Sequence, residues 1–344
     1  MKAIRLVEVG QPLVASEIEI PQPAADEILI RVGAAGICHS DAHYRSGGSP
    51  AGPLPLALGH EVAGVVEQLG KGVTSVAIGD RVALDYLVTC GACDYCGTGD
   101  RQFCDTGKMI GKHRDGGYAE YICLPAENAV AVPDSVSLEA AALMMCSSST
   151  SLHALHKARL APGETVAIFG VGGLGMSAIQ LARVLKARQV FAVDIDPARL
   201  AMAAELGAVS IDAQQSDPVQ EIRARTGGRG VDVAVELIGL PITMQQSVQS
   251  LGVHGRAALV GITQQGFTLT PYDELINKEA EVVGVSDHMA SDLPQLLAWA
   301  AAGELDFSQV ITERVPLQAD AINEVLDRLE CHGGGVRAVI VPGN

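Results

Sequence analysis

The stretch Thr165-Val-Ala-Ile-Phe169 runs directly into Gly170-Val-Gly-Gly-Leu-Gly175. The first five residues are apolar or β-branched and predict a buried strand, and Met176–Ala187 has the apolar spacing of a helix. Further along the chain, Gln189–Val193 predicts a second strand and Pro197–Leu206 a second helix. Additional buried strands are expected at residues 231–237 and 257–262. Strands that alternate with helices predict an α/β domain with a doubly wound parallel sheet.

The glycine-rich turn in this stretch is typical of a nucleotide site. Gly170 allows a tight turn after the strand, Gly172 lets the backbone approach a pyrophosphate, and Gly175 lets the helix pack on the strand. Gly173 and Leu174 lie in the part of the turn that opens the helix, and the N-terminus of the helix offers free N–H groups to an anion. Its place between a strand and a helix makes this turn a dinucleotide fingerprint. The alternative is a glycine-rich turn that binds nothing.

An acidic residue stands where a dinucleotide site needs one. Asp194 follows the strand Val190–Val193, about 20 residues beyond the turn. Its carboxylate can accept hydrogen bonds from both adenosine ribose hydroxyls, and it would repel a 2′-phosphate. No basic residue directly follows it, so the sequence favours NAD over NADP. Arg199 is a second candidate contact to the ribose, and the alternative for Arg199 is a solvated helix residue.

The remaining parts of the chain have a different pattern. Up to about residue 140, short strand candidates such as Glu27–Val32 and Glu61–Leu69 are separated by clusters of glycine and proline. The C-terminal part predicts two helices and a final strand, at residues 293–301, 319–329 and 337–341. The fingerprint region is therefore flanked on both sides by sequence of another kind.

Composition and charge exclude several classes of function. The chain has 344 residues, 48% of them hydrophobic, which suits two domains with sizeable cores. Its 24 basic and 40 acidic residues give a net charge of −16, which argues against nucleic acid and anionic membranes as partners. No apolar run is long enough for a spanning helix, and the N-terminus does not resemble a signal peptide. We expect a cytoplasmic protein, in which eight cysteines indicate metal binding or catalysis rather than disulfides.

Half of the cysteines are closely spaced, in the pattern C-x2-C-x2-C-x7-C. They are Cys90, Cys93, Cys96 and Cys104. Four thiolates this close can form a closed tetrahedral shell around Zn²⁺, which is the arrangement of a structural site. A redox or iron–sulfur site is the alternative, but the usual iron–sulfur run has the spacing C-x2-C-x2-C-x3-C-P.

A second set of metal-binding residue types is dispersed along the chain. Cys38 begins Cys-His-Ser-Asp-Ala-His, His60 lies in Leu-Gly-His-Glu-Val, and Cys146 lies in Met-Met-Cys-Ser-Ser-Ser. A buried structural cysteine is the commoner fate of each cysteine taken singly. Taken together, two thiolates and one imidazole with an open fourth position form a catalytic zinc set.

These motifs, in this order, resemble the zinc-dependent medium-chain alcohol dehydrogenases over essentially the whole chain. The motifs that carry the resemblance are Gly36–Asp41, Gly59–Glu61, Gly79–Val82, the four-cysteine segment, Gly117–Tyr121 and Gly170–Gly175. In such enzymes a β-rich GroES-like catalytic domain is interrupted by a Rossmann domain. The resemblance places the catalytic domain at residues 1–152 and 288–344, and the Rossmann NAD-binding domain at residues 153–287.

The resemblance also implies two zinc ions per chain. Cys38, His60 and Cys146 look like the ligands of the catalytic ion, and the four clustered cysteines look like those of the structural ion. Asp41 and Glu61 are expected to orient His60 and the catalytic ion from behind. A cysteine as third ligand resembles the alcohol-oxidising branch, whereas polyol and secondary-alcohol branches tend to place Glu or Asp near that position.

The reaction implied is hydride transfer from an alcohol to NAD, with release of a proton and formation of an aldehyde or ketone. In the family, a hydroxyl group, the nicotinamide ribose and a histidine carry the proton to solvent, and Ser40 and His43 match these positions. The alternative is a surface histidine and a turn serine. His39 and Arg337 resemble residues that contact the pyrophosphate.

Further cofactor and substrate contacts are expected from the same resemblance. Thr150, Val260 and Ile262 are candidate cofactor contacts, and Tyr86 and Leu152 are candidate walls of the substrate pocket. Small residues at Gly47-Gly48-Ser49 suggest room for a larger substrate. The segment between Cys104 and Gly117 is short, as in tetrameric microbial relatives, so we expect a homotetramer.

Three alternatives lie in other classes or branches. A zinc-free quinone or enoyl reductase would lack both cysteine sets, and both are present. A non-catalytic protein that binds zinc and nucleotide would be favoured by loss of Ser40 or of the third ligand, and neither is lost. A polyol dehydrogenase is the runner-up within the family.

Overall fold

The computed structural model describes residues 1–331, 333 and 335–343, and it divides the chain into two compact units. The first unit consists of Met1–Cys146 and the segment from Met289 onward, and the second is Ser147–His288. The resemblance placed the first boundary after residue 152, and in the structure it lies after Cys146. The reason is helix α4 (Ser149–Lys157), because Ser151 Oγ lies 2.8 Å from the carbonyl oxygen of Leu174 in helix α5 (Gly173–Val184).

The second unit is built on a parallel sheet with helices on both faces. In spatial order its strands are β13 (Val209–Asp212), β12 (Gln189–Asp194), β11 (Thr165–Phe169), β14 (Val231–Glu236), β15 (Leu251–Leu259) and β16 (Glu281–Gly284). The chain thus runs outward from β11 in one direction and then returns to β14 on its other side. This order confirms the predicted doubly wound sheet and places its switch point between β11 and β14.

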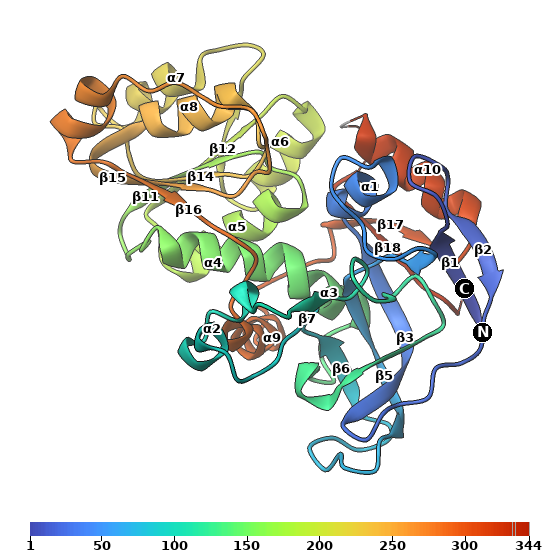
Figure 1. Cartoon of the computed structure of the whole chain (residues 1–344). Helices are drawn as coiled ribbons and strands as arrows, with labels where there is room; N and C mark the ends of the chain where they lie inside the picture. Colours follow the sequence, from blue (N-terminus) through green and yellow to red (C-terminus); the bar gives the residue numbers. More distant parts are fainter. Residues whose placement is uncertain (332, 334, 344) are drawn as a thin grey trace. The chain divides into compact units, whose positions relative to one another are not determined.

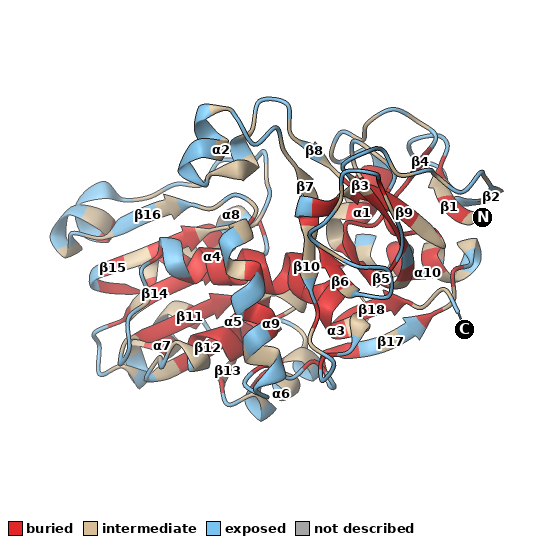
Figure 2. Cartoon of the chain, turned by 90° about the horizontal axis from the view of Figure 1, so that it is seen from below, coloured by how far each residue is buried: buried red, intermediate tan, exposed pale blue. Residues whose placement is uncertain are grey.

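Helices cover the two faces of this sheet. Besides α4 and α5 they are α6 (Pro197–Glu205), α7 (Pro218–Arg225) and α8 (Pro241–Gln249). Figure 1 shows α4 and α5 on one face and α7 and α8 on the other. The central strands β11, β12 and β14 are almost entirely buried, as the red ribbons in Figure 2 show, because both of their faces are covered.

Sequence signals explain where several of these helices begin. The Asp196 carboxylate accepts hydrogen bonds from the backbone N–H groups of Ala198 and Arg199, and Pro197 occupies the first helical position of α6. Two predicted ranges were wrong. Helix α5 begins within the glycine-rich turn rather than at Met176, and β15 covers residues 251–259 rather than 257–262.

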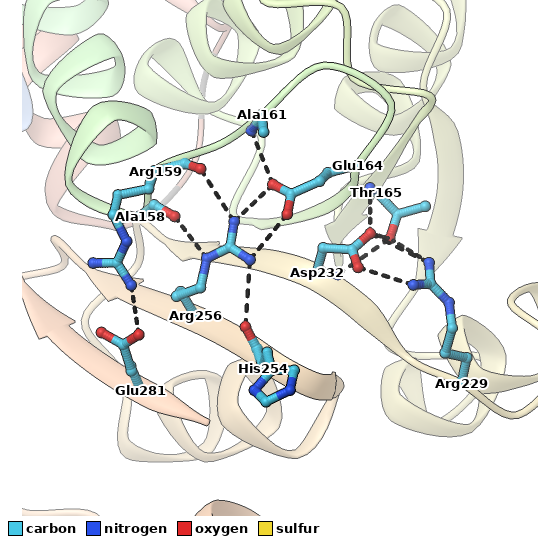
Figure 3. Close-up of polar contacts among 10 residues, drawn as sticks. All are labelled: Ala158, Arg159, Ala161, Glu164, Thr165, Arg229, Asp232, His254, Arg256 and Glu281. Carbon is cyan, nitrogen blue, oxygen red and sulfur yellow. Dashed lines mark hydrogen bonds and ion pairs between the residues drawn. The ribbon is translucent and has the colours of Figure 1, made fainter. Parts of the chain in front are cut away.

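Polar contacts fix the edge of the sheet at which the strands begin. Figure 3 shows Asp232 of β14 accepting hydrogen bonds from the backbone and hydroxyl of Thr165, at 2.7 and 2.8 Å, and from Arg229. In the same view, Arg256 of β15 donates to both oxygens of Glu164, at 3.0 and 2.6 Å. These side chains tie neighbouring strands together at the edge opposite the glycine-rich turn.

The first unit is mainly β-structure. Among its described residues, the largest sheet has the order β10 (Ala129–Ala131), β6 (Arg81–Leu84), β5 (Glu61–Leu69), β3 (Glu27–Ile37), β18 (Arg337–Ile340) and β17 (Ile311–Val315), and β9 (Tyr121–Pro125) also pairs with β3. Smaller sheets contain β2 (Val14–Glu17), β1 (Lys2–Leu6) and β4 (Leu56–Ala57), and β7 (Leu87–Val88) with β8 (Lys108–Met109). The last strand of the chain, β18, pairs antiparallel with β3, so both ends of the sequence contribute to one sheet.

Short helices connect these strands and carry much of the chemistry. They are α1 (His39–Ser46), α2 (Asp94–Thr98), α3 (Leu138–Leu143), α9 (Leu293–Ala301) and α10 (Ala319–Glu330). Helix α3 continues into a π-helical turn, Met144–Ser148. The range predicted for α9 is confirmed, and α10 extends one residue further than predicted. In the described part of the chain, no helix combines the length and apolar character needed to cross a membrane.

Candidate active site and metal centres

Two cysteines and a histidine from distant parts of the sequence meet inside the first unit. Cys38 is the N-cap of α1, His60 directly precedes β5, and Cys146 lies in the π-helical turn after α3. Their ligand atoms, with a carboxylate oxygen of Glu61, all lie within 4.8 Å of one another, and all four residues are buried. The sequence therefore identified the members of a real cluster, although their spacing gave no sign of it.

Asp41 holds two members of this cluster in place. Its Oδ2 accepts a hydrogen bond from the backbone N–H of Cys38 at 2.9 Å, and its Oδ1 lies 3.4 Å from Nδ1 of His60. The hydroxyl of Tyr118 donates to the same carboxylate at 2.9 Å. Because Asp41 faces Nδ1, the Nε2 atom of His60 is the ring nitrogen left to bind a metal. Tyr118 was missed as a site residue, since a tyrosine in an apolar segment predicts only a core position.

Glu61 and Arg337 form a buried ion pair beside the cluster. The guanidinium of Arg337, on β18, donates to Oε2 of Glu61. The resemblance suggested a phosphate contact for Arg337, and in this structure one of its guanidinium nitrogens donates to Glu61. The pair follows from strand pairing, because β3 lies between β5, which begins with Glu61, and β18, which begins with Arg337.

Interactions within the cluster shift the pKa values of its members in opposite directions. A hydrogen bond with Cys146 lowers the pKa of the Cys38 thiol well below its usual value, although burial opposes this shift. The same hydrogen bond, together with burial, raises the pKa of the Cys146 thiol. Burial lowers the pKa of His60, but Asp41 and Cys38 together outweigh this effect and hold the pKa well above its usual value. Burial also raises the pKa of Glu61 to about 7, against the opposing charge of Arg337. A metal requires two thiolates and a neutral imidazole, so its uptake must release protons from this cluster.

Helix α1 places further polar side chains next to Cys38. Ser40 Oγ lies 3.8 Å from Cys38 Sγ. His43, one turn further along the helix, is half-buried, and its ring centroid lies 4.7 Å from that of His39. The structure thus brings the hydroxyl expected to act on the substrate close to the cluster, and the two histidines close to each other.

The two residues expected to line a substrate pocket are both buried in their own units. The Tyr86 ring packs edge-on against His60, with centroids 5.3 Å apart. This contact supports the imidazole of His60 from the side. Leu152 is buried within helix α4 of the second unit, and Thr150 is buried two residues earlier.

The four clustered cysteines form a separate surface lobe around α2. Their sulfur atoms all lie within 4.8 Å of one another, and the residues are exposed or half-buried. Cys104 Sγ accepts a hydrogen bond from the backbone N–H of Cys90 at 3.3 Å, which lowers the pKa of the Cys104 thiol to about 6. The N–H groups of Ala92 and Cys93 lower the pKa of Cys90 in the same way. Converging thiols with N–H donors behind them fit a tetrahedral zinc ion.

The glycine-rich turn of the second unit has the geometry that a pyrophosphate requires. Gly170 adopts φ +91°, where a side chain would be strained, and an added Cβ there would meet Ile238 at 2.5 Å. An added Cβ at Gly172 would meet nothing within 4 Å, so the backbone is open at this point. Gly173 begins α5, with Leu174 and Gly175 in its first turn. The turn therefore presents helix N–H groups at the carboxyl end of β11.

Asp194 stands at the end of the neighbouring strand β12, as predicted. Its Oδ2 accepts a hydrogen bond from the N–H of Val171 at 2.8 Å, and its Oδ1 accepts from Ile195 and Asp196 at 2.8 and 3.0 Å. The carboxylate thus helps to build the turn. Arg199 lies 3.6 Å from Asp196, so in this structure its guanidinium is directed at a neighbouring carboxylate.

Val260 and Ile262 follow β15 at the same edge of the sheet. Val260 donates its N–H to the backbone oxygen of Glu236 at 2.9 Å. Ile262 is 75% exposed, an unusual state for a large apolar side chain. An exposed isoleucine at the carboxyl ends of parallel strands is suited to contact a ring of a bound nucleotide.

Comparisons with known proteins cover both units. The alcohol dehydrogenase GroES-like domain matches residues 24–134, and the zinc-binding dehydrogenase domain matches residues 173–302. An alcohol dehydrogenase of Geobacillus stearothermophilus is 36% identical over 96% of each chain. An NAD-dependent alcohol dehydrogenase of Sulfurisphaera tokodaii is 35% identical over 99% of this chain and 100% of its own.

The chain belongs to the zinc-dependent medium-chain alcohol dehydrogenase family. The structure of an alcohol dehydrogenase from Thermus sp. ATN1 is similar throughout, with a TM-score of 0.91, 30% identity and coverage of 99% of this chain and 100% of the other. The first unit is therefore the GroES-like domain of the family and the second is its Rossmann domain. The thiol and imidazole donors of both clusters fit the zinc for which the family is named.

Proposed function

We propose that this protein is an NAD-dependent zinc alcohol dehydrogenase that reversibly oxidises primary or secondary alcohols to aldehydes or ketones. The observation that carries the proposal is the buried meeting of Cys38, His60 and Cys146 at the end of the helix that contains Ser40. The similarity to enzymes named alcohol dehydrogenases over nearly the whole chain supports the same activity.

Two zinc ions per chain are part of this proposal. Cys38, His60 and Cys146 would hold a catalytic ion with one position left open, and the surface lobe would hold a structural ion with none. When bound, zinc supplies a Lewis acid that favours ionisation of an alcohol, and NAD⁺ accepts the hydride. The Asp41 carboxylate orients the His60 ring. The opposite charges of Glu61 and Arg337 compensate each other beside the same cluster.

The proton released in alcohol oxidation needs acceptors on the protein. Ser40 Oγ, next to Cys38, is proposed to accept this proton while it donates its own hydroxyl proton toward the nicotinamide ribose, and the imidazole of His43 is proposed to accept the proton from the ribose and pass it to water. His43 is half-buried and lies on the same short helix, which supports its place at the outer end of the path. Tyr86 and Leu152 remain proposed pocket residues.

The nucleotide site is proposed to lie at the carboxyl ends of β11, β12, β14 and β15. The turn Gly170–Gly175 would bind the pyrophosphate, and Asp194 would accept hydrogen bonds from the adenosine ribose. The remaining proposed cofactor contacts are His39, Thr150, Arg199, Val260, Ile262 and Arg337. The carboxylate of Asp194 favours NAD over NADP because a 2′-phosphate next to it would be repelled.

A homotetramer in the cytoplasm completes the proposal. Strand β16 is the last strand at one side of the six-stranded sheet, and its Val282 is exposed, which supports pairing of this edge with a second copy. The composition and the number of cysteines support the location.

A substrate screen tests the activity. Purified protein is assayed for NADH absorbance with primary, secondary, aromatic and polyol substrates, with NAD⁺ and NADP⁺ in parallel, and its zinc content is measured. We expect turnover of simple alcohols with NAD⁺ and two zinc ions per active chain. Activity only on polyols would reassign the substrate class. A preference for NADP⁺ of about tenfold or more, about 1.4 kcal/mol, would contradict the proposed role of Asp194.

A further inference from the structure

Glu236 is the last residue of β14 and lies at the switch point of the parallel sheet. It is fully buried, and it stands between Phe169 at the end of β11 and Leu259 at the end of β15. Ligands of doubly wound sheets bind just beyond the carboxyl ends of the strands at such a point. A buried carboxylate is costly unless donors surround it, so its position calls for a reason.

One oxygen of this carboxylate organises the loop that follows β14. Glu236 Oε1 accepts hydrogen bonds from the backbone N–H groups of Ile238 and Gly239, at 3.0 and 2.9 Å, and from the hydroxyl of Thr243 at 2.7 Å. Thr243 lies in the first turn of α8, so one oxygen joins the strand end, the loop and the helix that follows. Hydrogen bonds to a charged group are stronger than those between neutral groups.

The backbone of Glu236 also holds the loop after β15. Its carbonyl oxygen accepts hydrogen bonds from the N–H groups of Val260 and Gly261, at 2.9 and 3.1 Å. An added Cβ at Gly261 would meet Oε2 of Glu236 at 2.6 Å and the backbone of Gly239 as well. No described residue donates a hydrogen bond to Oε2, which lies buried next to Gly261.

The loops that Glu236 holds are packed backbone to backbone against each other and next to the glycine-rich turn. Gly239 has φ +89°, and an added Cβ there would lie 2.6 Å from the carbonyl oxygen of Ile262. An added Cβ at Gly170 would lie 2.5 Å from the side chain of Ile238. Ile238 and Ile262 both remain exposed at this edge. A shift of the loop after β14 would therefore move two exposed apolar residues and press on the fingerprint turn.

We infer that Glu236 is a positioning residue for the dinucleotide, whose carboxylate fixes the loops carrying Ile238 and Ile262 in the arrangement that binds it. This inference rests on the proposed function, because it takes a nicotinamide dinucleotide as the ligand of this crevice. Glu236 acts through the loops and need not touch the ligand itself.

A matched control lies on the same strand. Asp232, near the other end of β14, is also a carboxylate that accepts several hydrogen bonds, from Thr165 and Arg229 (Figure 3). Removing either carboxylate should lower the melting temperature, because both join neighbouring segments of one sheet. Only Glu236 lies at the edge where the nucleotide is expected, so only its removal should change nucleotide affinity.

The test measures the dissociation constant of NADH by fluorescence titration, together with the melting temperature of each variant without NADH. We expect Glu236→Ala to weaken NADH binding about tenfold or more, the loss of about 1.4 kcal/mol. Glu236→Gln keeps an acceptor oxygen and should restore most of the affinity. Asp232→Ala should bind NADH within about twofold of the wild type. Thr243→Val, which removes a single donor, should weaken binding by a smaller factor.

Two results would overturn the inference while leaving the proposed function intact. One is a folded Glu236→Ala variant that binds NADH as tightly as the wild type. The other is an Asp232→Ala variant whose NADH binding is weakened as much as that of Glu236→Ala, because the weakening would then reflect only a general loss of stability. If Glu236→Ala does not fold, unchanged affinity in Thr243→Val has the same consequence. A wild type that binds neither NADH nor NADPH would instead overturn the proposed function, and the inference with it.

Discussion

Ser40 and His43 occupy the same helix but differ in their distance from the reacting centre, and this difference can be measured. Ser40→Ala should reduce kcat/KM for alcohol oxidation by about 10²-fold or more, because its hydroxyl would accept the proton from the reacting alcohol while donating its own to the next group in the path. His43→Gln should cost less, and should slow the reaction most at low pH, where hydroxide cannot replace the lost base. Ser46→Ala removes a hydroxyl from the other end of the helix and serves as the control. Profiles of kcat/KM from about pH 6 to pH 10 decide the matter.

An unchanged pH profile in His43→Gln would remove this histidine from the path. Near-wild-type activity in Ser40→Ala would contradict the whole relay.

Asp232 should make the stability of the Rossmann domain depend on pH. Burial raises the pKa of Asp232, but hydrogen bonds from Thr165 and the charge of Arg229 lower it by a larger amount. The pKa of Asp232 therefore lies below its usual value. The ionised form therefore stabilises the folded state above the unfolded value of about 3.9, and this contribution is lost as pH falls through the folded value. The melting-temperature difference between wild type and Asp232→Asn should be greater at neutral pH and shrink as pH falls to about 4 and below.

The fully exposed Asp134 supplies the control, since Asp134→Asn should change the melting temperature little at any pH. A difference for Asp232→Asn that is constant from neutral to acidic pH would show that its charge is not responsible.

Single residues show how far sequence reasoning reaches into the site. Cys38, His60 and Cys146 were identified because thiols and imidazoles are rare and their local motifs are distinctive. The Glu61–Arg337 pair was not foreseen, because it depends on two strands separated by nearly the whole chain that lie on either side of β3. Glu236 was missed for a related reason, since an acidic residue that ends a buried strand reveals its purpose only when the loops around it are seen.

At the scale of elements, the cysteine lobe around α2 should depend on its metal for stability. Cys93→Ser should lower the melting temperature and the zinc content, because a closed zinc site contributes folding free energy. Cys146→Ser should instead abolish turnover with a smaller effect on folding. Cys331→Ser removes an exposed thiol outside both clusters and is the control. Zinc analysis and thermal unfolding of the three variants give the answer, and full zinc content in Cys93→Ser would contradict a structural site.

Element boundaries were predicted best where strong periodicity meets a clear stop signal. Strand β5, strand β11 and helix α9 have the predicted bounds. The start of β15 was missed because the register with β14 shifts between Leu251 and Arg256, so the regular strand pattern in the sequence begins only after this irregularity. The early start of α5 has a similar cause, since glycines normally disfavour a helix, and here the first turn is held by packing.

At the scale of the whole molecule, the proposed tetramer predicts a mass in solution. One chain has a mass of 35.7 kDa, so light scattering at micromolar concentration should give about four times this value. Replacing the exposed Val282 of β16 with Asp should shift the mass downward, because a buried like-charge pair would form at a symmetric strand contact. A mass near 36 kDa for the wild type would contradict the assembly.

The two cysteine clusters differ in solvent exposure, and this difference determines the order in which they are chemically modified during storage. The thiols of the surface lobe face solvent or lie near it, whereas Cys38 and Cys146 are enclosed. Peroxide, alkylating reagents and foreign heavy metals will therefore reach the lobe first. A stored preparation should lose its resistance to heat while freshly assayed turnover is still intact, and only later lose its catalytic power. Chemical modification of the protein should therefore be detectable at the lobe before it reaches the buried cluster.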